Sequence, residues 1–140
     1  MNVITISTQM LFGQAIAANL FMDGGPVFMT LILISLLAAL GCLVKGFLTV
    51  KKSLSVAYKS LKLAVDFSLL ALVMGFLGSV IGLISAFDSV EAMGSPTPEM
   101  FASGLKISLL TATFGLFSFI ISRIGIIILR MMLPSEDISA

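Results

Sequence analysis

Three long apolar runs constrain this chain more than any other feature. They lie at residues 26–50, 63–87 and 101–130, and each is long enough to cross a hydrocarbon layer about 30 Å thick. Because 59% of the 140 residues are hydrophobic and only 11% are charged, a soluble domain of this size could not bury the apolar surface. Lipid does not tolerate unpaired backbone groups, and the runs lack strand-like alternation. We therefore expect an all-α membrane protein with three spans in a single domain.

The charges of the two links orient the spans. The link at residues 51–62 carries four lysines and no acid, whereas the link at residues 88–100 carries three acids and no base. By the positive-inside rule, the first link is cytoplasmic and the second lies on the outer side. This predicts an outer N-terminus and a cytoplasmic C-terminal tail at residues 131–140.

The segment before the first span carries no charge over residues 1–22. Its apolar residues can share one side of a helix, which suits an interfacial helix on the outer surface, and without a basic n-region we expect it to remain on the mature protein. Asp23 can cap a new helix and Pro26 suits its first turn, so the first span begins there.

Small and hydroxylated residues recur at steps of three and four in the second and third runs, which places them on one face of each helix. Lipid supplies no hydrophobic drive between helices, so such faces pack closely. The expected packing residues are Gly75, Gly78, Gly82, Gly104, Gly115 and Ser118. A polar path is the alternative role for part of this pattern, chiefly for the hydroxyls of Ser79, Thr111 and Thr113.

The charged residues within the apolar runs include Asp66, Lys106 and Arg123. An isolated carboxylate at Asp66 would be costly in lipid, and Arg123 lies at a comparable depth in the third run. We therefore predict an ion pair between them, within or between subunits, and favour a structural role over a proton relay. Lys106 can either snorkel to the outer surface or line an outer vestibule.

The chain lacks the residues of common catalytic and metal sites. It has no His, and its one cysteine, Cys42, lies within the first span, where a packing role is expected. These absences predict no enzyme, no metal and no cofactor.

Three motifs resemble the MotA/TolQ/ExbB proton-channel family. They are FMDGGPVFM at residues 21–29, GFLGSVIGLI at residues 75–84 and GLKISLLTATFGL at residues 104–116. Their order and spacing agree with the family, and the likeness extends from Phe21 to Arg130. The resemblance implies a pentamer in the bacterial inner membrane around two single-span partners of the ExbD/TolR/MotB type. A membrane aspartate of the partner would carry the proton.

The resemblance also assigns positions. Ser79 takes the place of the second-span pore threonine, and Ala112 that of the third-span pore threonine, with Thr111 and Thr113 beside it. Ile107 stands where iron-uptake and Tol members have a glutamate, and residues 51–62 replace a long cytoplasmic hairpin. The residues expected along the ion path or facing the partner are Ser79, Ser108, Thr111, Ala112 and Thr113.

Two functions remain open from the sequence. The first is a proton-channel subunit of an ion-motive-force-driven motor that energises its single-span partner. The second is a pentameric scaffold that clamps a partner helix and conducts nothing. A small-solute carrier is disfavoured, because the spans show no internal repeat and no interrupted helix.

Overall fold

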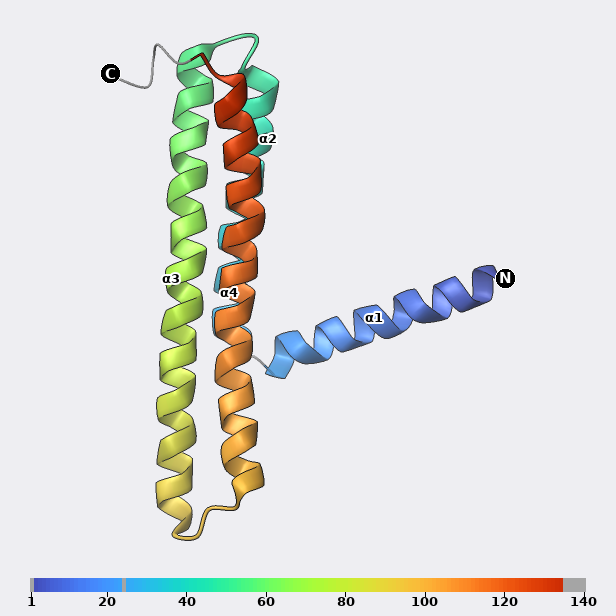
Figure 1. Cartoon of the computed structure of the whole chain (residues 1–140), viewed down its shortest axis with the longest axis vertical. Helices are drawn as coiled ribbons and strands as arrows, with labels where there is room; N and C mark the ends of the chain where they lie inside the picture. Colours follow the sequence, from blue (N-terminus) through green and yellow to red (C-terminus); the bar gives the residue numbers. More distant parts are fainter. Residues whose placement is uncertain (1, 24, 135–140) are drawn as a thin grey trace.

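The computed structural model describes residues 2–23 and 25–134, with the side chains of residues 16–23 left aside. Four helices make up this part of the chain, and it contains no strand: α1 (Val3–Asp23), α2 (Pro26–Thr49), α3 (Leu54–Met93) and α4 (Pro98–Met132). Helices α2, α3 and α4 lie side by side in an elongated bundle, and α1 projects from it across the long axis (Figure 1). The expected all-α architecture is confirmed.

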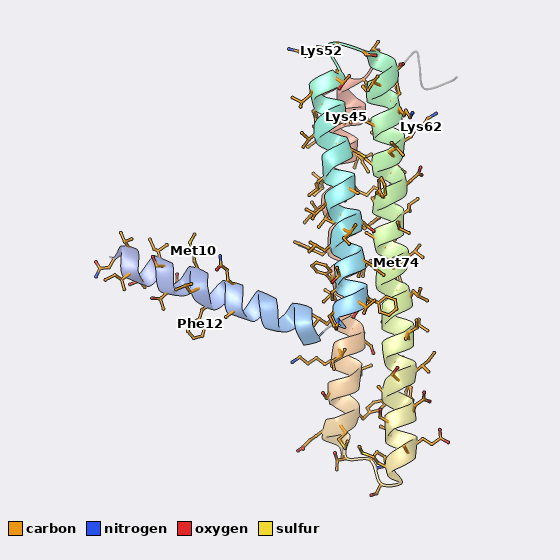
Figure 2. All side chains as sticks on the ribbon, turned by 180° about the vertical axis from the view of Figure 1, so that it is seen from behind. Met10, Phe12, Lys45, Lys52, Lys62 and Met74 are labelled. Atoms are coloured by element: carbon orange, nitrogen blue, oxygen red, sulfur yellow. The ribbon has the colours of Figure 1, made fainter. Side chains whose placement is uncertain are left out.

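Three of the helices are long and apolar enough to cross a membrane, namely α2, α3 and α4. Their uncharged stretches cover residues 27–44, 67–87 and 107–122. Lys45, Lys52 and Lys62 lie toward one end of the bundle, beyond these stretches (Figure 2). Apolar side chains are exposed along the outer surfaces of the three helices, as expected where lipid is the neighbour.

The helix α3 is longer than the predicted second span. It begins at Leu54 after the extended residue Ser53, so most of the basic link at residues 51–62 is the first part of the same helix. Nothing stops the helix before Gly94, which adopts a left-handed conformation with φ of 69°. The loop between α3 and α4, which is predicted to lie on the outer side, is consequently reduced to four residues, 94–97, because α4 begins at Pro98.

The start of α4 follows its local sequence. Pro98 occupies the first turn, and the Thr97 side chain accepts a hydrogen bond from the Met100 N–H at 3.4 Å. Glu99 lies in this first turn, where a negative charge is favourable to the helix dipole.

The predicted N-terminal helix is present as α1. Met10 and Phe12, on opposite sides of α1 in Figure 2, are each 67% exposed. The break before α2 occurs at Gly25, whose φ of 83° suits glycine, and Pro26 begins the next helix. α1 joins the bundle at the start of α2, which is level with Gly78 of α3 because Phe28 lies against that residue, and α3 and α4 extend well beyond this level (Figure 1). The interfacial position of α1 remains a prediction.

The buried residues of α3 and α4 recur at alternating steps of three and four. In α3 they include Ala57, Ala64, Ala71, Gly75 and Gly78, and in α4 Ser108, Thr111, Gly115, Ser118 and Ser122. A repeat of this kind averages 3.5 residues, which is the period of a left-handed antiparallel coiled coil. Residues seven apart along either helix therefore lie on the same side of the pair.

Candidate functional site

The seam between α3 and α4 is formed by backbone contact. A Cβ atom placed on Gly75 would lie 2.7 Å from the Gly115 Cα atom, and one placed on Gly115 would lie 2.8 Å from the Gly75 Cα atom. This contact is close to the middle of the uncharged stretches of both helices. At this layer the backbones of the two helices are in direct contact, with no side chain between them.

Toward the loop that joins α3 and α4, the seam continues through small residues. A Cβ atom on Gly82 would lie 3.0 Å from the Ser108 Oγ atom, and one on Gly104 would collide with Ala86. One on Gly78 would lie 2.7 Å from the Thr111 methyl group. Five of the predicted packing residues thus have the neighbouring helix within contact distance.

The buried hydroxyls of the seam mostly bond to their own helix. Ser108 donates to the Gly104 carbonyl at 3.0 Å, Thr111 to the Ile107 carbonyl at 3.3 Å, and Ser122 to the Ser118 carbonyl at 2.9 Å. Ser118 is fully buried, and its Oγ atom has no hydrogen-bond partner in the described part of the chain. Within one chain, the hydroxyls of Ser108, Thr111, Ser118 and Ser122 are thus almost fully buried between the helices.

Helix α2 covers only one side of the seam. A Cβ on Gly46 would lie 3.6 Å from the Ser60 Cβ atom, and Met74, two heptads along α3 from Ser60, lies between α3 and α2 in Figure 2. In an antiparallel pair, a residue one position after a contact residue lies on the same side of the seam in both helices. A residue one position before a contact residue lies on the other side. The opposite side of the seam is consequently left uncovered.

We define this uncovered side as the α2-free face. All of its members are half-buried, and they are Leu72, Ser79, Ala86, Ala112 and Phe119. Each of them except Ala86, which faces Gly104 across the seam, directly follows a buried seam residue. In the view of Figure 1, α3 and α4 stand in front of α2, so this face is turned toward the reader. Leu72 and Phe119 lie toward the basic end, whereas the other three side chains are small. The face is therefore shallow from Ser79 toward the outer end.

Ser79 and Ala112 lie at one level of the α2-free face. Gly78 packs against Thr111, so the next residues of the two antiparallel helices fall beside one another. The Ser79 hydroxyl makes no hydrogen bond to any described residue, whereas Thr111, behind it, bonds to its own helix. Ser79 is therefore a hydroxyl near the middle of the uncharged stretch of α3, level with the first turn of α2, and it is free to bond to water or to a partner.

The structure separates the five residues predicted along the ion path. Ser79 and Ala112 lie on the α2-free face, while Ser108 and Thr111 are each only 2% exposed within the seam. Thr113 is exposed on the surface of α4 away from the seam, and its hydroxyl donates to the Leu109 carbonyl at 2.8 Å. Lys106, seven residues before Thr113, lies along the same surface and is exposed.

Comparison with known proteins gives one match. The family described as the MotA/TolQ/ExbB proton channel family matches residues 49–133, which is more than half of the chain. The chain belongs to this family. No curated protein and no solved structure matches it.

Membership in the MotA/TolQ/ExbB family carries several general conclusions. The protein is a multi-pass protein of the inner membrane with a general proton-channel role, and its family is a transport component rather than an enzyme class. Relatives act together with ExbD/TolR/MotB-like partners. The matched residues include all of α3 and α4, and therefore the whole α2-free face.

The predicted ion pair between Asp66 and Arg123 does not form within one copy of the chain. Asp66 and Arg123 lie at the same level, but no ion pair joins them among the described residues, and Asp66 is exposed. The Arg123 guanidinium instead lies 4.8 Å from the centre of the Phe119 ring, and its Nε atom is buried without a hydrogen-bond partner. A pair between neighbouring subunits remains a prediction.

Two features of the site were not foreseen from the sequence. One is the contact of Arg123 with Phe119, and the other is the uncovered face on which Ser79 lies. The seven-residue spacing of Ser79 and Ala86, each one position after the small-residue pattern, could have indicated the second feature. The described residues contain no group of side chains that could hold a metal ion, and Cys42 is a half-buried free thiol in α2.

Proposed function

We propose that this protein is the proton-channel subunit of a stator-type motor driven by the ion-motive force. Five copies surround two copies of a single-span ExbD/TolR/MotB-like partner, with the N-terminus outside and the basic end of the bundle in the cytoplasm. The α2-free face of each copy points toward the partner, and α2 faces lipid. Support comes from the family match together with the arrangement of α2 on one side only of the α3·α4 seam.

The observation that carries this proposal is the unbonded Ser79 hydroxyl. Ser79 is half-buried on the α2-free face near the middle of the uncharged stretch of α3, and its neighbour across the seam is the small residue Ala112. A hydroxyl in this position can donate to and accept from water or a carboxylic acid, which lowers the cost of a proton in hydrocarbon. Thr111 and Ser108 contribute to the seam behind this face rather than to the path.

The protonatable group of the path must come from the partner. No Asp, Glu, Lys or Arg lies between Asp66 and Asp88 of α3 or between Lys106 and Arg123 of α4. Hydroxyls alone do not hold a proton near neutral pH, because an isolated serine is neither a base nor an acid there. A partner aspartate at the level of Ser79 would supply this group, and the two alanines of the α2-free face leave room for it.

Replacing Ser79 with alanine tests the assignment. One hydrogen bond contributes about 1 kcal/mol, so we expect proton flux through liposomes that contain the complex to fall by roughly fivefold to tenfold. Ser79→Thr, which keeps the hydroxyl, should retain most of the flux. Thr113→Ala is the matched control, since it removes a hydroxyl from the other surface of α4, and equal losses in Ser79→Ala and Thr113→Ala would refute the assignment.

A non-conducting scaffold is the second candidate. It is favoured by Ala112, which stands where the family's pore threonine is expected, and by the seam hydroxyls that bond to their own helices. A scaffold would assemble with the same partner and show no proton flux in any variant. The same flux assay therefore separates the two functions.

A further inference from the structure

A groove with a volume of about 1010 Å³ opens at the basic end of the bundle between α3 and α4. Its charged lining consists of Lys59, Lys62 and Arg130, with one carboxylate, Asp66. Its apolar lining includes Leu61, Val65 and Leu133 from the two helices. No residue of α2 lines the groove, so it lies on the side of the seam that α2 leaves open.

The three cations of the groove lie at nearly one level. Gly46 approaches both Ser60 and Leu129, which places these two residues of α3 and α4 side by side. Lys59, Lys62 and Arg130 therefore fall within about one helical turn of each other. All three side chains are exposed, and none of them forms an ion pair with another described residue.

This level corresponds to the headgroup layer of a bilayer. Lys62 precedes the uncharged stretch of α3, which begins at residue 67, by about 7 Å along the helix axis. The apolar side chain of Val65 lies deeper, toward the hydrocarbon, and so continues the groove in that direction. The groove thus offers cations where phosphate groups lie and an apolar wall where acyl chains begin.

We propose that this groove binds one anionic phospholipid of the cytoplasmic leaflet. Lys59, Lys62 and Arg130 contact the phosphate and headgroup, and the acyl chains pass Val65 toward the hydrocarbon. Positive charge at the membrane surface attracts anionic lipids, and the excess of three cations over one carboxylate provides it. A free phosphate ion would use only the cations and leave the apolar wall unoccupied. Val65 lies seven residues before Leu72, so the groove continues the α2-free face, and in the proposed pentamer the bound lipid lies on the inner side of the ring. The leaflet follows from the proposed orientation, whereas the site itself does not depend on proton conduction.

Native mass spectrometry of the purified complex, in nanodiscs of phosphatidylcholine with a minor fraction of phosphatidylglycerol, tests this proposal. We expect one phosphatidylglycerol retained per chain, and roughly tenfold weaker retention in the variant Lys59→Gln/Lys62→Gln/Arg130→Gln. The matched control is Lys45→Gln/Lys51→Gln/Lys52→Gln. It removes three cations from the same end of the bundle, none of which lines the groove, and it should retain the lipid.

Three results would overturn the proposal. Equal loss of phosphatidylglycerol in both triple variants would mean diffuse attraction by the basic end. Displacement of the lipid by inorganic phosphate at millimolar concentration would mean a phosphate site without use of the apolar wall. A third result would be a wild-type complex without lipid whose number of copies changes in the groove variant only. It would mean that a second copy of the chain fills the groove. Proton flux is measured separately, so failure of the lipid site leaves the proposed function intact.

Discussion

Replacing Gly75 with alanine is expected to lower the free energy of unfolding of the bundle by about 3 kcal/mol, at the upper end of typical overpacking costs. The added Cβ atom would lie 2.7 Å from the Gly115 Cα atom, and a backbone atom cannot rotate away as the end of a side chain can. The two helices would have to separate over the whole central layer. The loss is measured by denaturant titration of the protein in micelles, followed by circular dichroism.

Gly41→Ala is the matched control for this prediction. Gly41 lies in the interior of α2, and an added Cβ atom there meets nothing within 4 Å. Alanine is the better helix former, so this variant should be as stable as the natural protein or slightly more stable. Equal stability of Gly75→Ala and Gly41→Ala would contradict the close approach of α3 and α4.

Filling the α2-free face is expected to have the largest effect on conduction. Ala112→Leu adds three carbon atoms beside Ser79, on a half-buried surface that has room for them without disturbing the seam. An apolar constriction excludes water from a pore, so proton flux should fall by more than roughly tenfold while assembly is unchanged. Flux is measured in liposomes, and assembly by native mass spectrometry of the same preparation.

The neighbouring residue supplies the control for Ala112. Thr113→Leu introduces the same side chain one position along α4, on the surface away from the seam, and should leave the flux near its original value. Ala112→Thr, which adds a hydroxyl to the α2-free face, should preserve or increase the flux. If Thr113→Leu blocked conduction and Ala112→Leu did not, the path would follow the other side of α4.

The sequence predicted the membrane helices and their contact faces because both depend on local pattern. The long apolar runs indicated the spans, and the three-and-four spacing of Gly75, Gly78 and Gly82 indicated a face of close packing. The helix α3 extends back to Leu54, so most of the predicted link at residues 51–62 belongs to the same helix as the second span. Basic residues are compatible with a helix, and nothing in that stretch breaks it.

The division of the hydroxyls could not be predicted from periodicity. Thr111 lies within the seam pattern, and Ser79 lies one position after it. A shift of one residue along a helix moves a side chain from the contact between the helices to the side of the seam. Which flank is open depends on where α2 packs, and that position follows from contacts such as Gly46 with Leu129, which join segments far apart in sequence. Arg123 illustrates the same limit, since its side chain lies against an aromatic ring of its own helix rather than beside the predicted carboxylate.

The central claim is that this family member conducts protons together with a single-span partner that supplies the carboxylate. The most direct test is to measure proton flux in liposomes that contain the complex, with the partner's membrane aspartate intact or changed to asparagine, after native mass spectrometry has established the copy numbers. We expect five copies of this chain around two partners, with flux that disappears in the asparagine form. A complex of the same composition that carries no flux with the aspartate intact would contradict the account and identify the protein as a scaffold.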